Sequence, residues 1–183
     1  MTNAVAATPL ATRPLGVRLA VALTGALAVA VAAQVALPIP GSPVPFTLQP
    51  LAVLIVGGLL GPRLGALSLV TYLAMGAAGL PVFAPLGAPG FARLLGPSGG
   101  FLLAFPVAAA VTGRLARPSL GACVVATLAG MAVIFMGGIA QLAILNPDAV
   151  ALIVTPFLAA DFVKALAAAV VIRRLRPRTP ARS

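Results

Sequence analysis

Long apolar runs make up almost the whole chain, and short clusters of Pro, Gly and Arg interrupt them. A membrane helix needs about 20 apolar residues. Six such spans fit the pattern: about 15–37, 47–60, 64–78, 98–115, 120–145 and 149–172. The breaks contain residues that stop helices, namely four prolines within 38–45, Gly61-Pro62 and Asn146-Pro147. We therefore predict an all-α integral membrane protein with six transmembrane helices.

The six spans are predicted to form a single membrane domain over residues 15–175. Residues 1–14 are then a cytoplasmic N-terminal tail, and residues 176–183 a basic cytoplasmic tail. The first apolar run is longer than the roughly 7–15 residues of a signal-peptide core, so we interpret it as a retained span. The longest connection, residues 79–97, is itself apolar. We expect it to fold back onto the protein, with a short helix near 91–95.

Composition supports a membrane location and excludes several kinds of chemistry. Hydrophobic residues make up 61% of the chain and charged residues only 8%, against about 25% charged in soluble domains. The net charge of +10 is not evidence for nucleic-acid binding, because the charges lie at the ends of apolar runs. The sequence has no His and one Cys, Cys123, so we predict no metal site, no cofactor and no catalytic triad. It also lacks a Walker motif, so any ATP hydrolysis would require another chain.

The basic residues are distributed unequally between the two sides of the predicted bundle. If both termini are cytoplasmic, ten of the 12 basic residues lie at the cytoplasmic ends of spans: Arg13, Arg18, Arg63, Arg114, Arg117, Arg173, Arg174, Arg176, Arg178 and Arg182. This bias predicts six spans with both ends inside. The two exceptions are Arg93, in the outer 79–97 connection, and Lys164, within the last span.

Asp161 and Lys164 are the charges predicted to lie inside a span, and their spacing places them on one helix face. Each costs about 2.5–3.5 kcal/mol at the bilayer centre. They either form an ion pair that fixes helix packing or face a polar ligand cavity, and the second interpretation is favoured. Arg93 either extends to lipid headgroups or caps a cavity and holds an anion.

Several uncharged features have two interpretations each. The polar side chains Gln34, Thr47, Gln49, Tyr72 and Gln141 either reach into a cavity or join helices. The first span also carries small residues at four-residue spacing: Ala22, Ala26 and Ala30, with Ala28 and Ala32 offset. Such a stripe serves either packing within the bundle or docking of a partner protein.

Four stretches form a specific combination with Asp161 and Lys164: Pro43-Val44-Pro45-Phe46-Thr47-Leu48-Gln49; Leu60-Gly61-Pro62-Arg63-Leu64-Gly65; Tyr72-Leu73-Ala74-Met75-Gly76 through Gly79-Leu80-Pro81-Val82-Phe83; and Gly96-Pro97-Ser98-Gly99-Gly100. With these residues the chain resembles the BioY family, biotin-binding S components of energy-coupling factor (ECF) vitamin transporters, over about residues 15–175. The resemblance implies a six-helix subunit in the inner membrane, with a cavity for high-affinity biotin binding and no enzymatic activity. It also implies two cytoplasmic ATPases and a transmembrane coupling subunit as partners, the latter docking on the Ala stripe of the first helix.

The resemblance to biotin-binding proteins implies roles for the candidate residues. Lys164 or Arg93 would hold the carboxylate of biotin, and Asp161 would accept from a ureido N–H. Three aromatic side chains would pack on the rings: Tyr72, Phe83 and Phe91.

One departure from the family pattern concerns residues 84–92, which contain no amide side chain where one is expected after Phe83. Part of the ureido recognition is then expected from Gln49, Ser98 or backbone groups. Two alternatives stay open at this point. The chain could be an S component for another vitamin, or an intramembrane enzyme or structural subunit.

Overall fold

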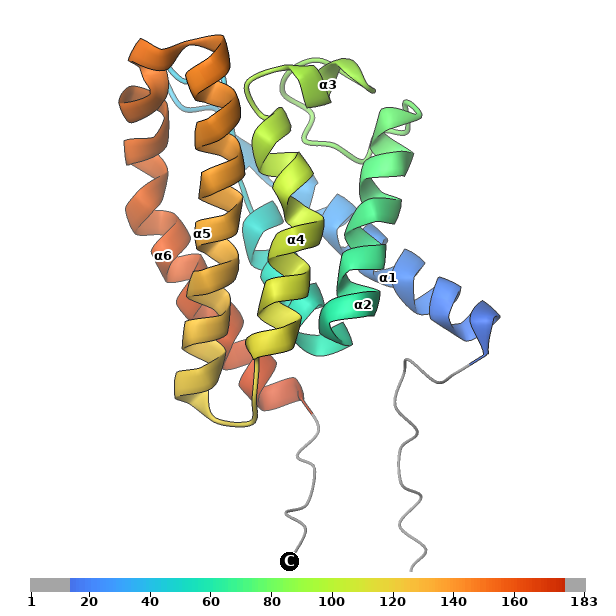
Figure 1. The fold of residues 1–183 in the computed structure, drawn as a ribbon. Helices are drawn as coiled ribbons and strands as arrows, with labels where there is room; N and C mark the ends of the chain where they lie inside the picture. Colours follow the sequence, from blue (N-terminus) through green and yellow to red (C-terminus); the bar gives the residue numbers. More distant parts are fainter. Residues whose placement is uncertain (1–13, 177–183) are drawn as a thin grey trace, which may run out of the picture.

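The computed structural model describes residues 14–176, and the chain is almost entirely helical (Figure 1). Its long helices are α1 (Leu15–Gln34), α2 (Gln49–Ala77), α4 (Gly99–Leu115), α5 (Leu120–Leu145) and α6 (Val150–Leu175). The connections contain α3 (Ala92–Leu95), a 3₁₀ turn η2 (Pro147–Ala149), and two short strands, β1 (Ala36–Leu37) and β2 (Phe46–Thr47). Nearly all of the two predicted tails, 1–14 and 176–183, lies outside the described residues.

Helix α2 consists of two arms joined at a sharp break. Gly61 has φ 80° and ψ 176°, a conformation that side-chain-bearing residues avoid, and Pro62 follows it. The arms 49–60 and 62–77 run in opposite directions from this turn (Figure 1). Counted separately, they bring the number of helical spans among the described residues to six, as predicted.

The first span is shorter than predicted. It ends at Gln34 because residues 36–37 pair as an antiparallel strand with β2, in the register Ala36↔Thr47 and Leu37↔Phe46. The prolines that follow lack the N–H that a helix needs. The second span consequently begins at Gln49, whereas α5 and the predicted short helix in the 79–97 connection lie where expected.

The helices have the length and apolar character of membrane spans. Four of the described helices (α1, α2, α5 and most of α6) are long and apolar enough to cross a membrane, although α2 reaches this length only when its two arms are taken together. The apolar α4 is shorter at 17 residues. Large apolar side chains are exposed along their outer surfaces, as on α1 at Leu23, Leu27 and Val31. Lipid is the solvent that tolerates such a surface.

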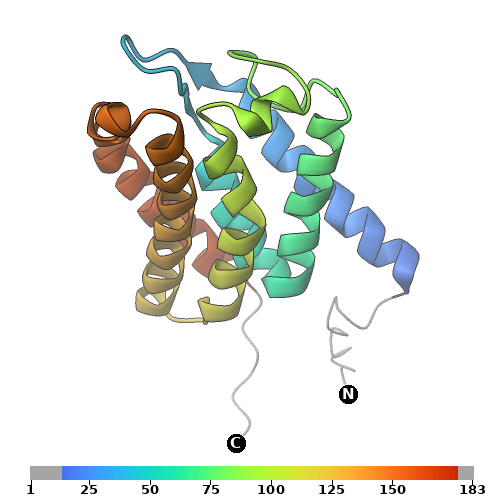
Figure 2. The same cartoon turned by 45° about the horizontal axis from the view of Figure 1, so that its top comes forward.

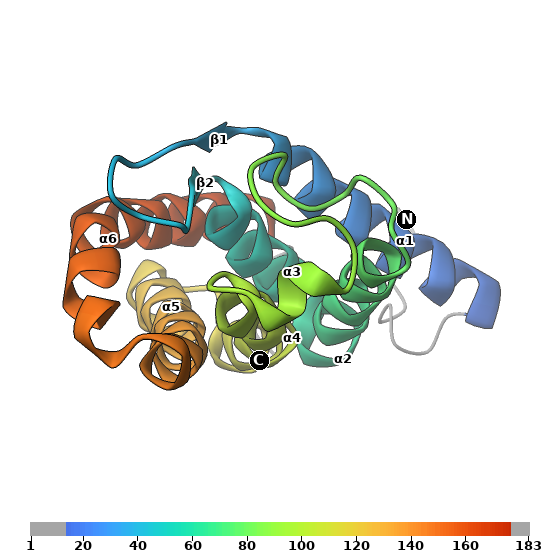
Figure 3. The ribbon, with the colours of Figure 1, turned by 90° about the horizontal axis from the view of Figure 1, so that it is seen from above.

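The two ends of the bundle differ in structure. One end, which we call the loop face, carries segments 35–48, 78–98 and 146–149 (Figure 2). Seen from above, these segments lie over the ends of the helices (Figure 3). The opposite end, the arginine face, carries the Gly61 turn, the turn between α4 and α5, and the ends of α1 and α6 nearest the termini (Figure 1). In sequence, these segments contain the described arginines other than Arg93: Arg18, Arg63, Arg114, Arg117, Arg173, Arg174 and Arg176.

Glycines let the central helices approach closely. A Cβ on Gly57 would lie 2.4 Å from the carbonyl oxygen of Ala109 on α4, and a Cβ on Gly100 would lie 2.1 Å from the carbonyl oxygen of Gly137 on α5. In lipid, helices associate largely through such small-residue contacts. Helix α4 is therefore fixed between α2 and α5, and it positions the side chains that face the interior.

Replacing Gly57 with Ala should destabilise the bundle, because the added methyl group overlaps the α4 backbone and the helices must separate. We expect a loss of about 1–3 kcal/mol of unfolding free energy, measured as a lower melting temperature in detergent. Gly121→Ala is the matched control, since nothing lies within 4 Å of its Cβ position. Equal melting temperatures for the two variants would contradict close packing at Gly57.

Candidate functional site

A small cavity lies between the segment before α2 and helices α4, α5 and α6. Its volume is about 50 Å³. Its lining is apolar except for one threonine and two charged residues: Val44, Pro45, Thr47, Pro50, Phe101, Phe105, Ile134, Phe157, Asp161 and Lys164. Among the described residues, the cavity thus brings both charges of the last span to one apolar space.

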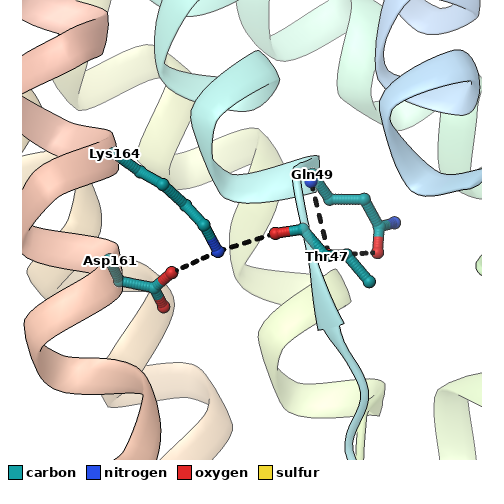
Figure 4. A network of polar contacts seen from close by, with 4 residues as sticks. All are labelled: Thr47, Gln49, Asp161 and Lys164. Atoms are coloured by element: carbon teal, nitrogen blue, oxygen red, sulfur yellow. Dashed lines mark hydrogen bonds and ion pairs between the residues drawn. The ribbon is translucent and has the colours of Figure 1, made fainter. Parts of the chain in front are cut away.

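Asp161 and Lys164 lie one turn apart on α6 and form a buried ion pair. The Lys164 Nζ atom is 2.6 Å from Asp161 Oδ1, and both residues are at most 7% exposed. Nζ also donates to the backbone carbonyl of Thr47, at 2.7 Å (Figure 4). The predicted shared face is confirmed. The pair joins α6 to the segment that precedes α2.

Phe46 completes the surroundings of the Lys164 ammonium group, and the sequence analysis did not identify it as a site residue. Nζ lies 3.5 Å from the ring centroid of Phe46, a cation–π contact. The Phe46 ring in turn stacks on Phe157, with centroids 6.3 Å apart. The available signal was the position of Phe46 directly before Thr47 in the Pro43–Gln49 motif.

Gln49 and Tyr72 form a polar network beside the cavity. Gln49 Nε2 donates to the Tyr72 hydroxyl at 2.5 Å, and that hydroxyl donates to the carbonyl of Val82 at 3.2 Å. Thr47 Oγ1 donates to Gln49 Oε1 at 3.1 Å, which links the network to the cavity wall. Neither Gln49 nor Tyr72 lines the cavity itself. Both predicted site residues therefore hold the wall in place.

Phe83 also lies behind the cavity wall. Its ring meets Tyr72 edge-on with centroids 5.4 Å apart, and it packs so closely on Gly76 that a Cβ there would lie 2.1 Å from the ring. Gln34 donates to the Phe83 carbonyl at 3.3 Å. In this structure Phe83 packs so as to fix the 79–97 connection, and its stacking on a ligand ring stays a prediction.

Arg93 is buried, but its guanidinium group does not face the cavity. It donates from Nη1 to the carbonyl of Leu86 and from Nη2 to the carbonyl of Ala84. Burial lowers the pKa of Arg93, yet a guanidinium stays protonated at neutral pH. In this structure the guanidinium group therefore binds loop carbonyls, and its role in holding a ligand anion stays a prediction. Its donors are engaged by the carbonyls of an irregular loop, which have few other partners.

Two further predictions concern residues that lie outside the cavity. Phe91 is 60% exposed at the start of α3 and does not line the cavity. Its contact with a ligand ring stays a prediction. Along α1, three alanines of the small-residue stripe are buried within the bundle: Ala22, Ala26 and Ala30. They cannot present a surface to a partner because α1 packs on α2 through that face. Ala28 is exposed and Ala32 partly exposed.

Replacing Arg93 with Met should loosen the 79–97 connection, because two carbonyls lose their donors at a cost of about 1–3 kcal/mol. We expect faster hydrogen exchange of amides in 84–90 and a lower melting temperature. Arg117→Met, at an exposed position, is the control. Unchanged hydrogen exchange in 84–90 together with loss of ligand binding would indicate that Arg93 contacts the ligand.

Comparison with known proteins identifies relatives along nearly the whole chain. The model of the BioY family matches residues 4–181. The chain is 40% identical to a probable biotin transporter BioY of Pyrococcus horikoshii, over 89% of this chain and 95% of the relative. It is 36% identical to the biotin transporter BioY of Rhodobacter capsulatus, over 87% and 93%.

The fold is also similar to a solved structure, that of the S-component for biotin from an ECF-type ABC transporter. The TM-score is 0.76 and the identity 26%, and the match covers 86% of this chain and 89% of the other. With the family match, these similarities show that the chain belongs to the BioY family.

Proposed function

We propose that this protein is a high-affinity biotin-binding membrane subunit that mediates biotin uptake as the S component of an ECF-type transporter. The observation that carries the proposal is the buried Asp161–Lys164 pair at an apolar cavity, in a chain of the BioY family. The relatives named as biotin transporters, and the solved S-component for biotin, support this ligand.

The geometry of the pair favours one end of biotin over the other. The carboxylate and the ureido ring are separated by the valerate chain, whereas Nζ and Oδ1 are only 2.6 Å apart. The ureido ring places a C=O acceptor directly beside an N–H donor. We therefore assign the pair to this ring, with Lys164 donating to the C=O and Asp161 accepting from the N–H. The aromatic walls at Phe101, Phe105 and Phe157 suit the apolar bicycle.

Biotin entry requires movement of the segment over the cavity. Ligand pockets commonly have volumes of about 300–1,000 Å³, and the cavity here has about 50 Å³. The Lys164 ammonium group is also occupied by the Thr47 carbonyl and the Phe46 ring. We propose that biotin displaces both contacts as segment 38–48 moves outward.

Replacing Lys164 with Met should weaken biotin binding at least about tenfold, because a hydrogen bond to a charged group and the partner of Asp161 are both lost. Biotinamide lacks the negative charge of biotin. Under the ureido assignment, the Lys164→Met replacement should weaken the binding of biotinamide by the same factor as the binding of biotin. Titration calorimetry on the purified protein measures both. Arg174→Met, at an exposed position on α6, is the control and should bind like wild type.

Two other results would contradict parts of the proposal. A loss confined to biotin, with biotinamide unaffected, would assign Lys164 to the carboxylate. Unchanged binding in both Lys164→Met and Asp161→Asn would contradict the site itself.

Transport energy is proposed to come from partner subunits. The sequence carries no Walker motif, so ATP hydrolysis is assigned to two cytoplasmic ATPases, which act through a transmembrane coupling subunit. We propose that the coupling subunit docks on the outer face of α1, where Ala28 is exposed beside Leu27 and Val31. The protein is thus a transport subunit in the inner membrane rather than an enzyme.

The orientation in the membrane is proposed from the arginine face, which we place in the cytoplasm together with both termini. Thiol labelling tests this in a Cys123→Ala background, because Cys123 is the only native thiol. In intact cells an impermeant reagent should label Ala88→Cys on the loop face and leave Pro118→Cys on the arginine face unlabelled until permeabilisation. Both positions are exposed. The reverse pattern would invert the topology.

A further inference from the structure

The arginine face carries positive charge that no acidic side chain of this protein offsets. The whole sequence contains two acidic residues. Asp148 lies in η2 on the loop face, and Asp161 is paired with Lys164 in the interior. Arg63 and Arg114 are both exposed on the arginine face. Any acidic group that binds them must therefore come from outside the side chains of this subunit.

Backbone packing holds these two arginines beside one pocket. Arg63 and Arg114 line a pocket of about 310 Å³ together with Leu60, Pro62 and Leu64. The end of α4 lies against the Gly61 turn, since a Cβ on Gly113 would be 2.5 Å from the Gly61 carbonyl carbon. The close contact of the two helices thus fixes the backbone positions from which both arginines reach this pocket.

An apolar groove begins where the basic pocket ends. It lies between α1 and the first arm of α2 and has a volume of about 410 Å³. Its lining is almost wholly apolar: Val21, Thr24, Gly25, Ala28, Ile55, Val56, Leu59 and Leu60. Leu60 lines both the groove and the basic pocket. An apolar chain attached to an anionic group therefore matches both parts of this surface.

We propose that Arg63 and Arg114 bind the phosphate headgroup of an anionic phospholipid whose acyl chain lies in the groove between α1 and α2. Planar guanidinium groups match phosphate oxygens in geometry and charge. Basic pockets between helices at the cytoplasmic membrane surface recognise anionic headgroups in this way. The apolar groove favours a lipid over a soluble phosphate, because a free anion would leave the groove unused. Ala28 lines this groove and also belongs to the face proposed to dock the coupling subunit, so the lipid and the coupling subunit would occupy that face in turn.

Native mass spectrometry of the full-length protein in neutral detergent tests the proposal, with phosphatidylglycerol compared against phosphatidylcholine of the same acyl chains. Wild type should retain phosphatidylglycerol preferentially. The double variant R63Q/R114Q should retain at least about fivefold less, given the contribution of each arginine near a lipid headgroup. R173Q/R174Q removes the same charge from exposed positions on α6 and is the matched control. Its retention should stay close to that of wild type.

Several results would overturn the proposal. Equal losses in the two double variants would indicate diffuse attraction by net charge. Equal retention of both lipids by wild type would show that no anionic headgroup is selected, as expected if a partner protein occupies this surface instead. Displacement of the lipid by millimolar inorganic phosphate would indicate a free-anion site.

Folding and biotin binding are checked separately. Both double variants should melt near the wild-type temperature and bind biotin normally, because neither pair of residues lines the biotin cavity. If R63Q/R114Q does not fold, the single variants R63Q and R114Q replace it, and full lipid retention in both would overturn the proposal. The lipid measurement does not depend on biotin, so its outcome is independent of the proposed transport function.

Discussion

Buried backbone carbonyls outside regular helices have no water to bond, so side chains must provide their donors. Five polar side chains of the helices donate hydrogen bonds to backbone carbonyls of the loop face. Lys164 donates to Thr47, Tyr72 to Val82, Gln34 to Phe83, Arg93 to Ala84 and Leu86, and Gln141 to Leu94 and Gly96. Four of these side chains tie an irregular segment to a long helix, and Arg93 holds the 79–97 connection together from within. The irregular segments keep defined positions above the bundle because these donors are placed by packed helices.

The same requirement explains why few of the buried polar side chains line the candidate site. Most buried donors are fully occupied by backbone carbonyls and have a structural role. Lys164 differs because its ammonium group bonds to a backbone carbonyl and also faces the cavity beside Asp161. The Lys164 ammonium group can exchange its contacts with Thr47 and Phe46 for a ligand at the cavity. The Arg93 guanidinium group donates to two loop carbonyls and does not face the cavity.

The sequence predicted the spans well because Pro and Gly mark where helices must stop, and α5 begins and ends as predicted. It also identified Asp161 and Lys164, since charges inside an apolar run are costly and few. It could not separate a buried arginine that binds a ligand from one that binds a loop, because both roles need a cation near irregular backbone. The two faces of α1 were likewise equivalent in sequence, and only the packing on α2 shows that Ala26 is inside and Ala28 outside. Phe46 was missed because its place over Lys164 depends on the pairing of β1 with β2, which local patterns do not reveal.

The prolines of segment 38–45 also bear on how quickly a ligand can enter and leave. Four of its residues lack an amide hydrogen, so this covering segment can form few backbone hydrogen bonds. Among the described residues its ties are chiefly the β1–β2 pairing, the bond from the Ser42 amide to the Ile39 carbonyl, and Lys164 on Thr47. Apolar packing therefore supplies much of its attachment, since Val44 is buried in one cluster with Leu142, Ile153 and Phe157. Under the proposed entry route, the capture rate and the residence time of the ligand both depend on how often this apolar contact opens.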